Sequence, residues 1–591
     1  MYRVDPKKAF EDHASRTPAS GDARLSDSAE RIIAAPVERT LSGAVIAGVA
    51  QIIEATLLAL LGYGIHLAYV EPRQDGFYIP VILASVLIAN IAFNAVRSHR
   101  IAAYRTIVSQ TGRVLGAWLG VMLILTVGLF FFKAGDMVSR IWLLSWFVSG
   151  AVLLACYRQV LRGLVLRWTA QGRLKRRTVI VGGGDDAARL IEQIQAGADK
   201  DINLLGLFDD RIGERSPDMV SGFEKLGKVS DLIEFARRTP IDLVLVSMPL
   251  SAEKRVLDML TQLWVLPVDI RLSAHMSKLR FTEKAYSYVG ELPVLDMADR
   301  PISDWNLIFK WIFDKVVALT ALILLSPIMV AAAIAIKLES KGPVFFVQNR
   351  HGFNNELIRI YKFRSMRVDM LDYDAAKQVT KDDPRVTRVG KFIRRTSIDE
   401  LPQILNVLKG ELSVVGPRPH ALQAKAANQL YYEAVEGYFA RHRVKPGMTG
   451  WAQINGWRGE TDTIDKIMQR VNHDLYYIEH WSILFDLYIV LMTPLYALLC
   501  HRLLVPSTRE AVGEFVGDAR RLMPNFAPET LFFAAGGTMM MVLSDAVPQS
   551  ALLAVGSLTA GTPVLSIALL LLLSLAIAAI GIHPFLTALL L

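Results

Sequence analysis

Long apolar segments alternate with polar stretches along the chain, and the first four apolar segments predict membrane-crossing helices. They lie at residues 41–70, 77–96, 114–132 and 141–161. Each is close to the roughly 20 residues that a helix needs to cross the hydrocarbon core of a bilayer. Residues 1–40 are polar, lack the apolar core of a signal peptide and predict a disordered tail. We therefore expect a four-helix transmembrane domain over residues 41–161.

The charges between these segments predict the orientation of the domain. The loop after the second segment and the stretch after the fourth carry basic residues and no acidic ones, namely Arg97, Arg100, Arg105 and Arg113, and then Arg158, Arg162, Arg167, Arg173, Lys175, Arg176 and Arg177. Because basic loops stay in the cytosol, both ends of the domain are predicted to be cytosolic. Glu54 and His66 interrupt the first segment, and we expect them to face a neighbouring helix or the interface.

An alternation of strand-like and helical stretches over residues 176–300 predicts an α/β domain. The strand-like runs lie at 178–181, 202–208, 241–247 and 268–272, and helical stretches such as 185–195 and 252–264 separate them. This alternation is typical of a parallel sheet, here of Rossmann type.

A glycine-rich turn in this domain has a functional and a structural interpretation. Gly182-Gly183-Gly184 follows the first strand and fits the G-x-G-x-x-A pattern of a dinucleotide site, with Asp209 and Asp210 at the distance of a ribose contact. Acids often end strands, however, and the Tyr-x-x-x-Lys pattern of short-chain reductases occurs only at Tyr373–Lys377, outside this domain. We expect a regulatory or structural domain and leave ligand binding open.

A fifth apolar run, residues 316–336, has two interpretations. Its length fits a crossing helix, but Ser326-Pro327 lies at its middle and basic residues flank it on both sides. Proline removes a backbone hydrogen bond and bends a helix, and a crossing would place the basic region that follows outside the cell. We therefore favour a re-entrant membrane helix that kinks at Pro327, with a kinked crossing helix as the alternative.

The polar region after this run contains the candidate catalytic residues. Asp399 and Glu400 are adjacent carboxylates in a region rich in cations, among them Lys362, Arg394 and Arg418. Phosphoryl chemistry uses this mixture, because cations and a metal neutralise a diphosphate, one carboxylate holds the metal and another attacks phosphorus.

The structural alternative for the two carboxylates is a helix cap. Ser397-Ile-Asp-Glu400 matches the S-x-x-E capping box, although Pro402 moves the predicted helix start towards Asp399. Spacing alone favours neither the catalytic nor the helix-cap interpretation.

Two further motifs suit a phosphate ligand or a plain turn. Pro417 and Pro419 fix the backbone on either side of Arg418, whose planar guanidinium matches phosphate. Gly447 and Gly450 would let the backbone approach a ligand closely, or make a turn.

Composition narrows the classes of function. The 591 residues are 52% hydrophobic, with a mean hydropathy of +0.33 and a net charge of +9. No basic face interleaved with stacking aromatics stands out, so we expect no nucleic acid partner. The two cysteines, Cys156 and Cys500, lie in apolar stretches and predict neither a disulfide framework nor a metal cluster.

Residues 305–481 resemble the bacterial sugar transferase family, the monotopic polyprenyl-phosphate phosphoglycosyl transferases. The matching stretches are Ser326-Pro327, 361–366, 396–403, 416–419, 445–451 and 474–478 before Trp481-Ser482. The four helices and the Rossmann-like module before them resemble the large subgroup that starts exopolysaccharide or O-antigen (lipopolysaccharide) repeat units. The implied fold is a membrane α-helical bundle, an α/β Rossmann-like domain and an α+β monotopic catalytic domain over 303–500 with a re-entrant membrane helix.

The resemblance also implies a two-step reaction. Asp399 matches the nucleophile that attacks the sugar-bearing phosphorus of a UDP-sugar and releases UMP, after which undecaprenyl phosphate takes the hexose-1-phosphate. Glu400 matches the carboxylate associated with Mg²⁺, and the matching phosphate contacts are Lys362, Arg394 and Arg418. The implied enzyme is an undecaprenyl-phosphate hexose phosphotransferase of the bacterial inner membrane, whose cytosolic catalytic domain contacts membrane lipid. The resemblance does not decide whether the enzyme forms a homodimer.

Two other functions compete with this one. The first is a membrane-tethered nucleotide-sugar epimerase or reductase acting through Gly182–Gly184, against which the missing Tyr-x-x-x-Lys pattern argues. The second is a non-catalytic scaffold of polysaccharide assembly, against which Asp399, Glu400 and Arg418 argue. Beyond the family pattern, residues 501–530 predict a linker and 531–591 an apolar C-terminal extension of unknown role.

Overall fold

The computed structural model describes residues 25–36, 40–69, 75–105, 108–196, 201–211, 217–248, 253–273, 287–289, 292–367, 383–420, 425–426, 429–431, 435, 437–457 and 463–500. The predictions for residues 1–24, for Tyr373–Lys377 and for residues 501–591 lie outside these ranges.

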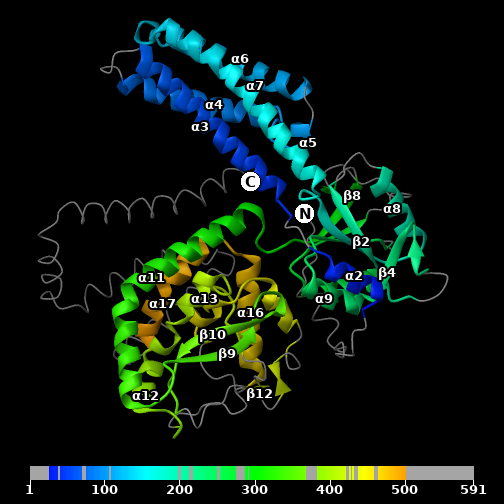
Figure 1. Cartoon of the computed structure of the whole chain (residues 1–591), viewed down its shortest axis with the longest axis vertical. Coiled ribbons are helices and arrows are strands. Elements are labelled where there is room, and N and C mark those ends of the chain that lie inside the picture. The colour runs from blue at the N-terminus through cyan, green and yellow to red at the C-terminus, as the bar shows by residue number, and fades with distance from the viewer. Residues whose placement is uncertain are drawn as a thin grey trace, which may run out of the picture. The chain divides into compact units, whose positions relative to one another are not determined.

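Four long helices form the N-terminal membrane domain: α3 (Gly43–Tyr69), α4 (Asp75–Ala95), α6 (Val108–Phe131) and α7 (Arg140–Ala170). The short helix α5 (Ile101–Arg105) and the 3-10 turn η2 (Gly135–Met137) lie in the connections. Each of the four is long and apolar enough to cross a membrane, and Figure 1 shows them side by side. They coincide with the four predicted segments and confirm that apolar helices form this part of the chain.

Buried tryptophans pack these helices against one another. Trp142 and Trp146 on α7 have no exposed surface, and their indole N–H groups donate to the α3 carbonyls of Gly62 and Leu58 over 2.8 and 3.1 Å. A Cβ atom at Gly62 would lie 2.7 Å from the Trp146 ring. The close approach of α3 and α7 therefore requires glycine at this position.

A buried ion pair also joins α3 to α7. Arg158 donates to both carboxylate oxygens of Glu54 over 2.7–3.1 Å, and both side chains are 2% exposed. His99, from the loop after α4, contacts the same carboxylate at 2.8 Å. Inside a membrane domain, ionisable side chains pair in this way because an isolated charge is costly there. The expectation that Glu54 faces a neighbouring helix is confirmed.

An eight-stranded sheet forms the α/β domain. Its strands are β1 (Arg176–Val181), β2 (Ile202–Phe208), β3 (Met219–Val220), β4 (Phe223–Gly227), β5 (Leu243–Val246), β6 (Asp269–Ser273), β7 (Ser287–Val289) and β8 (Leu292–Ala298), in the order β3-β4-β2-β1-β5-β6-β8-β7. The five central strands are parallel and the outer ones antiparallel. Helices α8 (Asp185–Ala196), α9 (Val229–Arg238) and α10 (Glu253–Leu263) alternate with the parallel strands. The α/β prediction is confirmed.

One part of the predicted tail belongs to this domain. Residues Asp27–Ala34 form helix α2, and Ala29 is fully buried in a core that includes Phe235 of α9. The Ser26 hydroxyl accepts a hydrogen bond from the Ala29 N–H over 3.2 Å and caps the helix. The prediction of disorder is wrong for this segment, because a short amphipathic helix gains its stability from the surface on which it packs.

The catalytic domain is built from helices and short strands. Its elements are α11 (Asp304–Glu339), β9 (Phe345–His351), η5 (Phe353–Asn355), β10 (Leu357–Phe363), α12 (Arg388–Arg395), η7 (Ile398–Glu400), α13 (Gln403–Lys409), β11 (Ser413–Val415), β12 (Lys425–Ala426), β13 (Gln429–Leu430), η8 (Tyr438–Arg443), β14 (Gly447–Thr449), α15 (Trp451–Ile454), α16 (Ile464–Glu479) and α17 (Ile483–Cys500). Strands β9 and β10 pair as an antiparallel hairpin, and β11 pairs with β14 in parallel.

Helix α11 packs on this domain along both of its halves. Ala318, in its first half, belongs to a core with Ile404 and Val407 of α13, and Ile336, near its end, packs on Phe363 and Ile393. The helix runs through Pro327 as one element of 36 residues, and Figure 1 shows that it bends. Its other face is apolar and exposed: Val316, Leu319, Ile323, Leu324, Ile328, Val330 and Ile334.

Asn406 joins α13 to strand β10, which carries Lys362. Its side chain accepts from the Tyr361 N–H over 3.0 Å and donates to the Arg359 carbonyl and to Glu411 over 2.6 Å, with no exposed surface. One buried amide therefore links α13, which begins three residues after Glu400, to the strand that carries Lys362.

Replacing this amide is expected to destabilise the catalytic domain. Asn406→Leu leaves the Tyr361 N–H and the Arg359 carbonyl without this partner. An unpaired buried group costs about 1–3 kcal/mol, and these two are only partly buried, so we expect a loss in the lower part of the summed range, roughly 2–4 kcal/mol. Thermal unfolding in detergent measures the change. Asn349→Leu, an exposed substitution on β9, is the control and should change stability by no more than about 0.5 kcal/mol. Equal melting temperatures for both variants would contradict the assigned role of Asn406.

Candidate active site

The structure brings Lys362 and Arg418 onto the same carboxylate. Lys362 Nζ, on β10, lies 2.8 Å from Glu400 Oε1, on η7. Arg418 Nη2 donates to the same oxygen, and its Nη1 donates to Glu400 Oε2 over 3.2 Å. Residues more than 50 positions apart in the sequence thus converge on one acid, as the phosphoryl interpretation of the motifs predicts.

The two adjacent carboxylates have different electrostatic environments. Burial alone would raise the pKa of Glu400, but Arg418 and Lys362 outweigh it and hold that pKa well below its usual range. Burial raises the pKa of Asp399; Lys362 opposes the rise and the negative charge of Glu400 adds to it. Arg394, at the end of α12, lies close enough to oppose the rise as well. The cations therefore favour the ionised form of Glu400, whereas burial disfavours the ionised form of Asp399.

The helix-cap interpretation of the two carboxylates is wrong. Ser397 has a left-handed backbone conformation (φ 60°) and its side chain makes no capping hydrogen bond. Residues Ile398–Glu400 form a 3-10 turn, and α13 begins after Pro402, at Gln403. The Glu400 side chain is held by cations instead of by the helix terminus.

Glycines next to Arg418 allow two backbone segments to touch. A Cβ atom at Gly447 would lie 2.1 Å from the Gly416 nitrogen, and one at Gly450 would lie 2.4 Å from the Gly416 oxygen. Both glycines are thus needed for a close approach to the segment before Pro417. The sequence predicts a close approach to a ligand or a plain turn at these glycines, whereas the observed partner is the backbone of Gly416.

Two arginines next to the site, the half-buried Arg350 and the fully buried Arg441, were not predicted from the sequence. Arg350 Nη1 on β9 donates to the Pro419 carbonyl over 2.5 Å, and Arg441 Nη2 on η8 donates to the Arg418 carbonyl over 2.7 Å. Burial, with Arg418 adding to it, lowers the pKa of Arg350 to about 10. The basic triplet Arg441-His-Arg443 was the available signal, because arginine is rarely buried without a specific partner.

A magnesium ion fits the donor set of the site only if the substrate completes its coordination. Among the residues that the structure describes, no group of three or more His, Cys, Asp or Glu side chains can hold a metal. Magnesium usually takes one or two carboxylates together with substrate phosphates and water. Glu400 Oε2 accepts a hydrogen bond from Arg418 over 3.2 Å, and Asp399 lies in the same 3-10 turn as Glu400. These residues fit a metal shared with a diphosphate.

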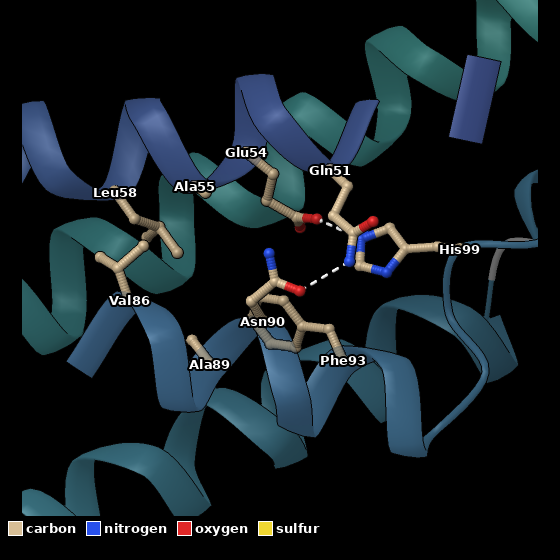
Figure 2. Close-up of a pocket in the computed structure, with 9 residues that line it drawn as sticks. All are labelled: Gln51, Glu54, Ala55, Leu58, Val86, Ala89, Asn90, Phe93 and His99. Atoms are coloured by element: carbon tan, nitrogen blue, oxygen red, sulfur yellow. Dashed lines mark hydrogen bonds and ion pairs between the residues drawn. The ribbon is translucent and has the colours of Figure 1, made fainter. Parts of the chain in front are cut away.

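A small cavity in the membrane domain is separate from these residues. Figure 2 shows Gln51 and Glu54 facing Asn90 and His99 across it, with hydrogen bonds Gln51–Asn90 and Glu54–His99 of 2.6 and 2.8 Å. Its volume of about 10 Å³ suffices for roughly one water molecule. The cavity cannot hold a nucleotide sugar.

The glycine turn of the α/β domain is lined by structural contacts. Arg211 Nη2 donates to the Gly183 carbonyl over 3.0 Å and pairs with Asp209 at 2.9 Å, while Asp210 accepts from the Val229 N–H at the start of α9. Two acids, Asp185 and Asp186, occupy the first turn of α8, where a bound phosphate would need positive potential.

Comparison with known proteins agrees with this geometry. The model of the bacterial sugar transferase family matches residues 305–499. The UDP-glucose:undecaprenyl-phosphate glucose-1-phosphate transferase of Xanthomonas campestris pv. campestris is 35% identical over 418 residues, which cover 70% of this chain and 86% of that protein. The chain belongs to the bacterial sugar transferase family. It is an enzyme, a phosphoglycosyl transferase, as the sequence predicts.

Two further relatives carry related names. The enzyme of Escherichia coli (strain K12) with the same name as the Xanthomonas protein is 39% identical over 359 residues, covering 61% of this chain and 75% of that one. An undecaprenyl-phosphate glucose phosphotransferase of Komagataeibacter xylinus is 42% identical over 330 residues, or 55% of this chain, and the match spans 59% of that relative.

A second family model, that of a CoA-binding domain, matches residues 96–274 of this bacterial sugar transferase. The residues of the glycine turn do not fit the phosphates of coenzyme A, because Asp185 and Asp186 stand at the α8 N-terminus and Arg211 bonds the turn.

Proposed function

We propose that this transferase moves hexose-1-phosphate from a UDP-sugar to undecaprenyl phosphate and so begins a polysaccharide repeat unit. The observation that carries the proposal is the pair Asp399 and Glu400, of which only Glu400 is held by Lys362 and Arg418. The relatives named for UDP-glucose make glucose the first sugar to test.

In the first step, a carboxylate oxygen of Asp399 attacks the sugar-bearing phosphorus of the donor. The bond from that phosphorus to the bridging oxygen breaks, and UMP leaves. Lys362, Arg394 and Arg418 lie within electrostatic reach of Asp399 and neutralise the charge of the diphosphate. Glu400 would hold Mg²⁺, which neutralises phosphate charge when bound.

In the second step, an oxygen of undecaprenyl phosphate attacks the same phosphorus. The bond to Asp399 breaks, the carboxylate is regenerated, and the product is a lipid diphosphate sugar. Dividing the transfer into two displacements lets one set of cations serve donor and acceptor in turn.

The raised pKa of Asp399 predicts a pH dependence. A protonated carboxyl cannot attack, and a raised pKa keeps the carboxyl protonated to a higher pH than usual. We therefore expect kcat/KM, which reports the free enzyme, to fall as the pH drops through a value above the ordinary aspartate pKa of about 3.9. A pH profile of kcat/KM tests this. An acid limb at or below about pH 4 would contradict the assignment.

We also propose that the α/β domain is Rossmann-like, that the catalytic domain is cytosolic, and that α11 re-enters the bacterial inner membrane instead of crossing it. Both halves of α11 pack on the same domain, while its opposite face is apolar and exposed. If α11 crossed the bilayer, its two ends would lie on opposite sides, where a single domain could not pack against both of them. Pro327 supports a bend, because it removes one backbone hydrogen bond.

Cysteine labelling tests this topology. In a Cys156→Ser, Cys500→Ser background, Leu307→Cys and Lys341→Cys flank the apolar run, and Met137→Cys lies in η2, between two crossing helices. An impermeant maleimide added to intact spheroplasts is expected to label Met137→Cys alone, and all three after permeabilisation. Labelling of Lys341→Cys in intact spheroplasts would show that α11 crosses.

The activity itself is tested with radiolabelled UDP-glucose, UDP-galactose and UDP-N-acetylgalactosamine, each with undecaprenyl phosphate and Mg²⁺. We expect a radiolabelled lipid from at least one donor, with one UMP released per lipid formed. Release of UDP in place of UMP would show transfer of the sugar without its phosphate and contradict the proposal.

A further inference from the structure

Three consecutive carbonyls of the loop around Arg418 are held from other parts of the catalytic domain. The Gly447 N–H donates to the Pro417 oxygen over 2.9 Å, Arg441 to the Arg418 oxygen over 2.7 Å and Arg350 to the Pro419 oxygen over 2.5 Å. The two prolines have no N–H to donate. The carbonyl oxygens are therefore the groups by which this loop is held.

Arg441 is the most deeply buried of these donors. It has no exposed surface, and its charge is paired with Asp474 on α16, 2.6 Å away and 2% exposed. Its guanidinium also lies over the ring of Tyr438, with 5.3 Å between the guanidinium carbon and the ring centroid. Burying an arginine is costly unless it is paired and hydrogen-bonded. The pair therefore fixes the Arg441 guanidinium against the Arg418 carbonyl.

We infer that Arg441 and Asp474 are positioning residues of the transferase, which fix the Arg418 backbone so that its guanidinium meets Glu400 and the donor phosphate. This inference rests on the proposed function. Arg441 touches the main chain of Arg418 and acts through it, since the side chain of Arg418 is the one that reaches Glu400. Lysine cannot replace Arg441, because a single ammonium cannot serve Asp474 and the Arg418 carbonyl, which Nη2 contacts, together with His420 and Tyr438, which Nη1 contacts.

A double-mutant cycle separates this role from a general effect on folding. Small misplacements of a substrate-binding group cost up to about 100-fold in rate, so Arg441→Lys is expected to lower kcat roughly 10- to 100-fold. In an Arg418→Ala background the same substitution is expected to change kcat by less than about twofold, because the group that it positions is gone. Losses that multiply in the double variant would overturn the inference.

A matched control lies two residues away on the same 3-10 helix. Arg443 is 5% exposed and donates to the Asp299 carbonyl over 2.8 Å. Arg443→Lys therefore also removes a buried guanidinium. Because Arg443 does not contact Arg418, we expect the kcat of this variant to stay near that of the wild type. If Arg441→Lys does not fold, Asp474→Asn, which keeps the shape and removes the charge, completes the same cycle. Failure of both to fold, with Arg443→Lys folded, would make the pair structural and overturn the inference.

The outcomes distinguish this inference from the proposed function. A wild-type enzyme that transfers no phosphosugar contradicts the proposed function. An active wild type in which the Arg441 and Arg418 losses multiply contradicts the positioning role alone.

Discussion

Asp399→Asn is expected to abolish both the covalent phosphosugar adduct and the lipid product. The amide keeps the shape of the side chain but has no anionic oxygen to attack phosphorus. Loss of a covalent route typically costs several orders of magnitude in rate, so we expect a fall of at least about 10³-fold in kcat. Steady-state transfer to undecaprenyl phosphate, with the variant shown to be folded by its melting temperature, measures the effect. A loss of only about tenfold would assign Asp399 a supporting role.

Glu400→Gln is the matched comparison, because it changes the neighbouring carboxylate in the same isosteric way. Lys362 and Arg418 lose their shared anion, and the metal would lose an anionic ligand. We expect a lower rate and a higher Mg²⁺ requirement, with the adduct still formed. If the Glu400→Gln enzyme formed no adduct and the Asp399→Asn enzyme did, Glu400 would be the nucleophile and Asp399 the residue that serves the metal.

Lys310→Met is expected to cause the largest loss of stability. Lys310 Nζ, on α11, lies 2.6 Å from Asp486 on α17 and 3.0 Å from the Val415 carbonyl, and Asp486 has no exposed surface. Removing one partner of a buried ion pair leaves an uncompensated charge and costs about 3–5 kcal/mol. For a domain the size of residues 303–500, this loss of stability lowers the melting temperature by roughly 10 °C.

The control for this prediction lies on the same helix. Lys337 is exposed near the end of α11, and Lys337→Met is expected to cost less than about 1 kcal/mol. Adding Asp486→Asn to Lys310→Met should recover part of the lost stability, since the unpaired charge is then removed. Thermal unfolding in detergent measures all three variants. A Lys310→Met protein as stable as Lys337→Met would show that the pair contributes nothing.

The parts of the fold that the sequence predicts are those in which local pattern decides the structure. The four segments predicted to cross the membrane match α3, α4, α6 and α7, because a run of about 20 apolar residues has few other stable environments. The strands β1, β2, β5 and β6 were found because short apolar runs alternate with amphipathic helices. Helix α2 was missed, since it has only eight residues and depends on the sheet against which it packs.

The same distinction between local pattern and tertiary contact separates the site residues that the sequence predicts from those that it does not. Asp399, Glu400, Lys362 and Arg418 were predicted together because their residue types suit phosphate chemistry, and three of them meet through the contacts on Glu400. Arg441 was not singled out from the sequence, and Asp474 was named only as the first residue of a family stretch, because the contact between them depends on tertiary structure. They stand 23 and 56 positions after Arg418. The helix-cap alternative was equally compatible with local spacing, and the Ser397 geometry together with the partners of Glu400 excludes it.

The central claim is that a phosphosugar is carried on Asp399 between donor and acceptor. Purified enzyme, UDP-sugar and Mg²⁺ are mixed without undecaprenyl phosphate, and both UMP release and intact-protein mass are measured. We expect a burst of about one UMP per active site and a mass increase of one phosphosugar, both absent in Asp399→Asn. Neither burst nor mass increase, in wild-type enzyme that turns over once the lipid is added, would contradict the account and indicate direct transfer in a single step.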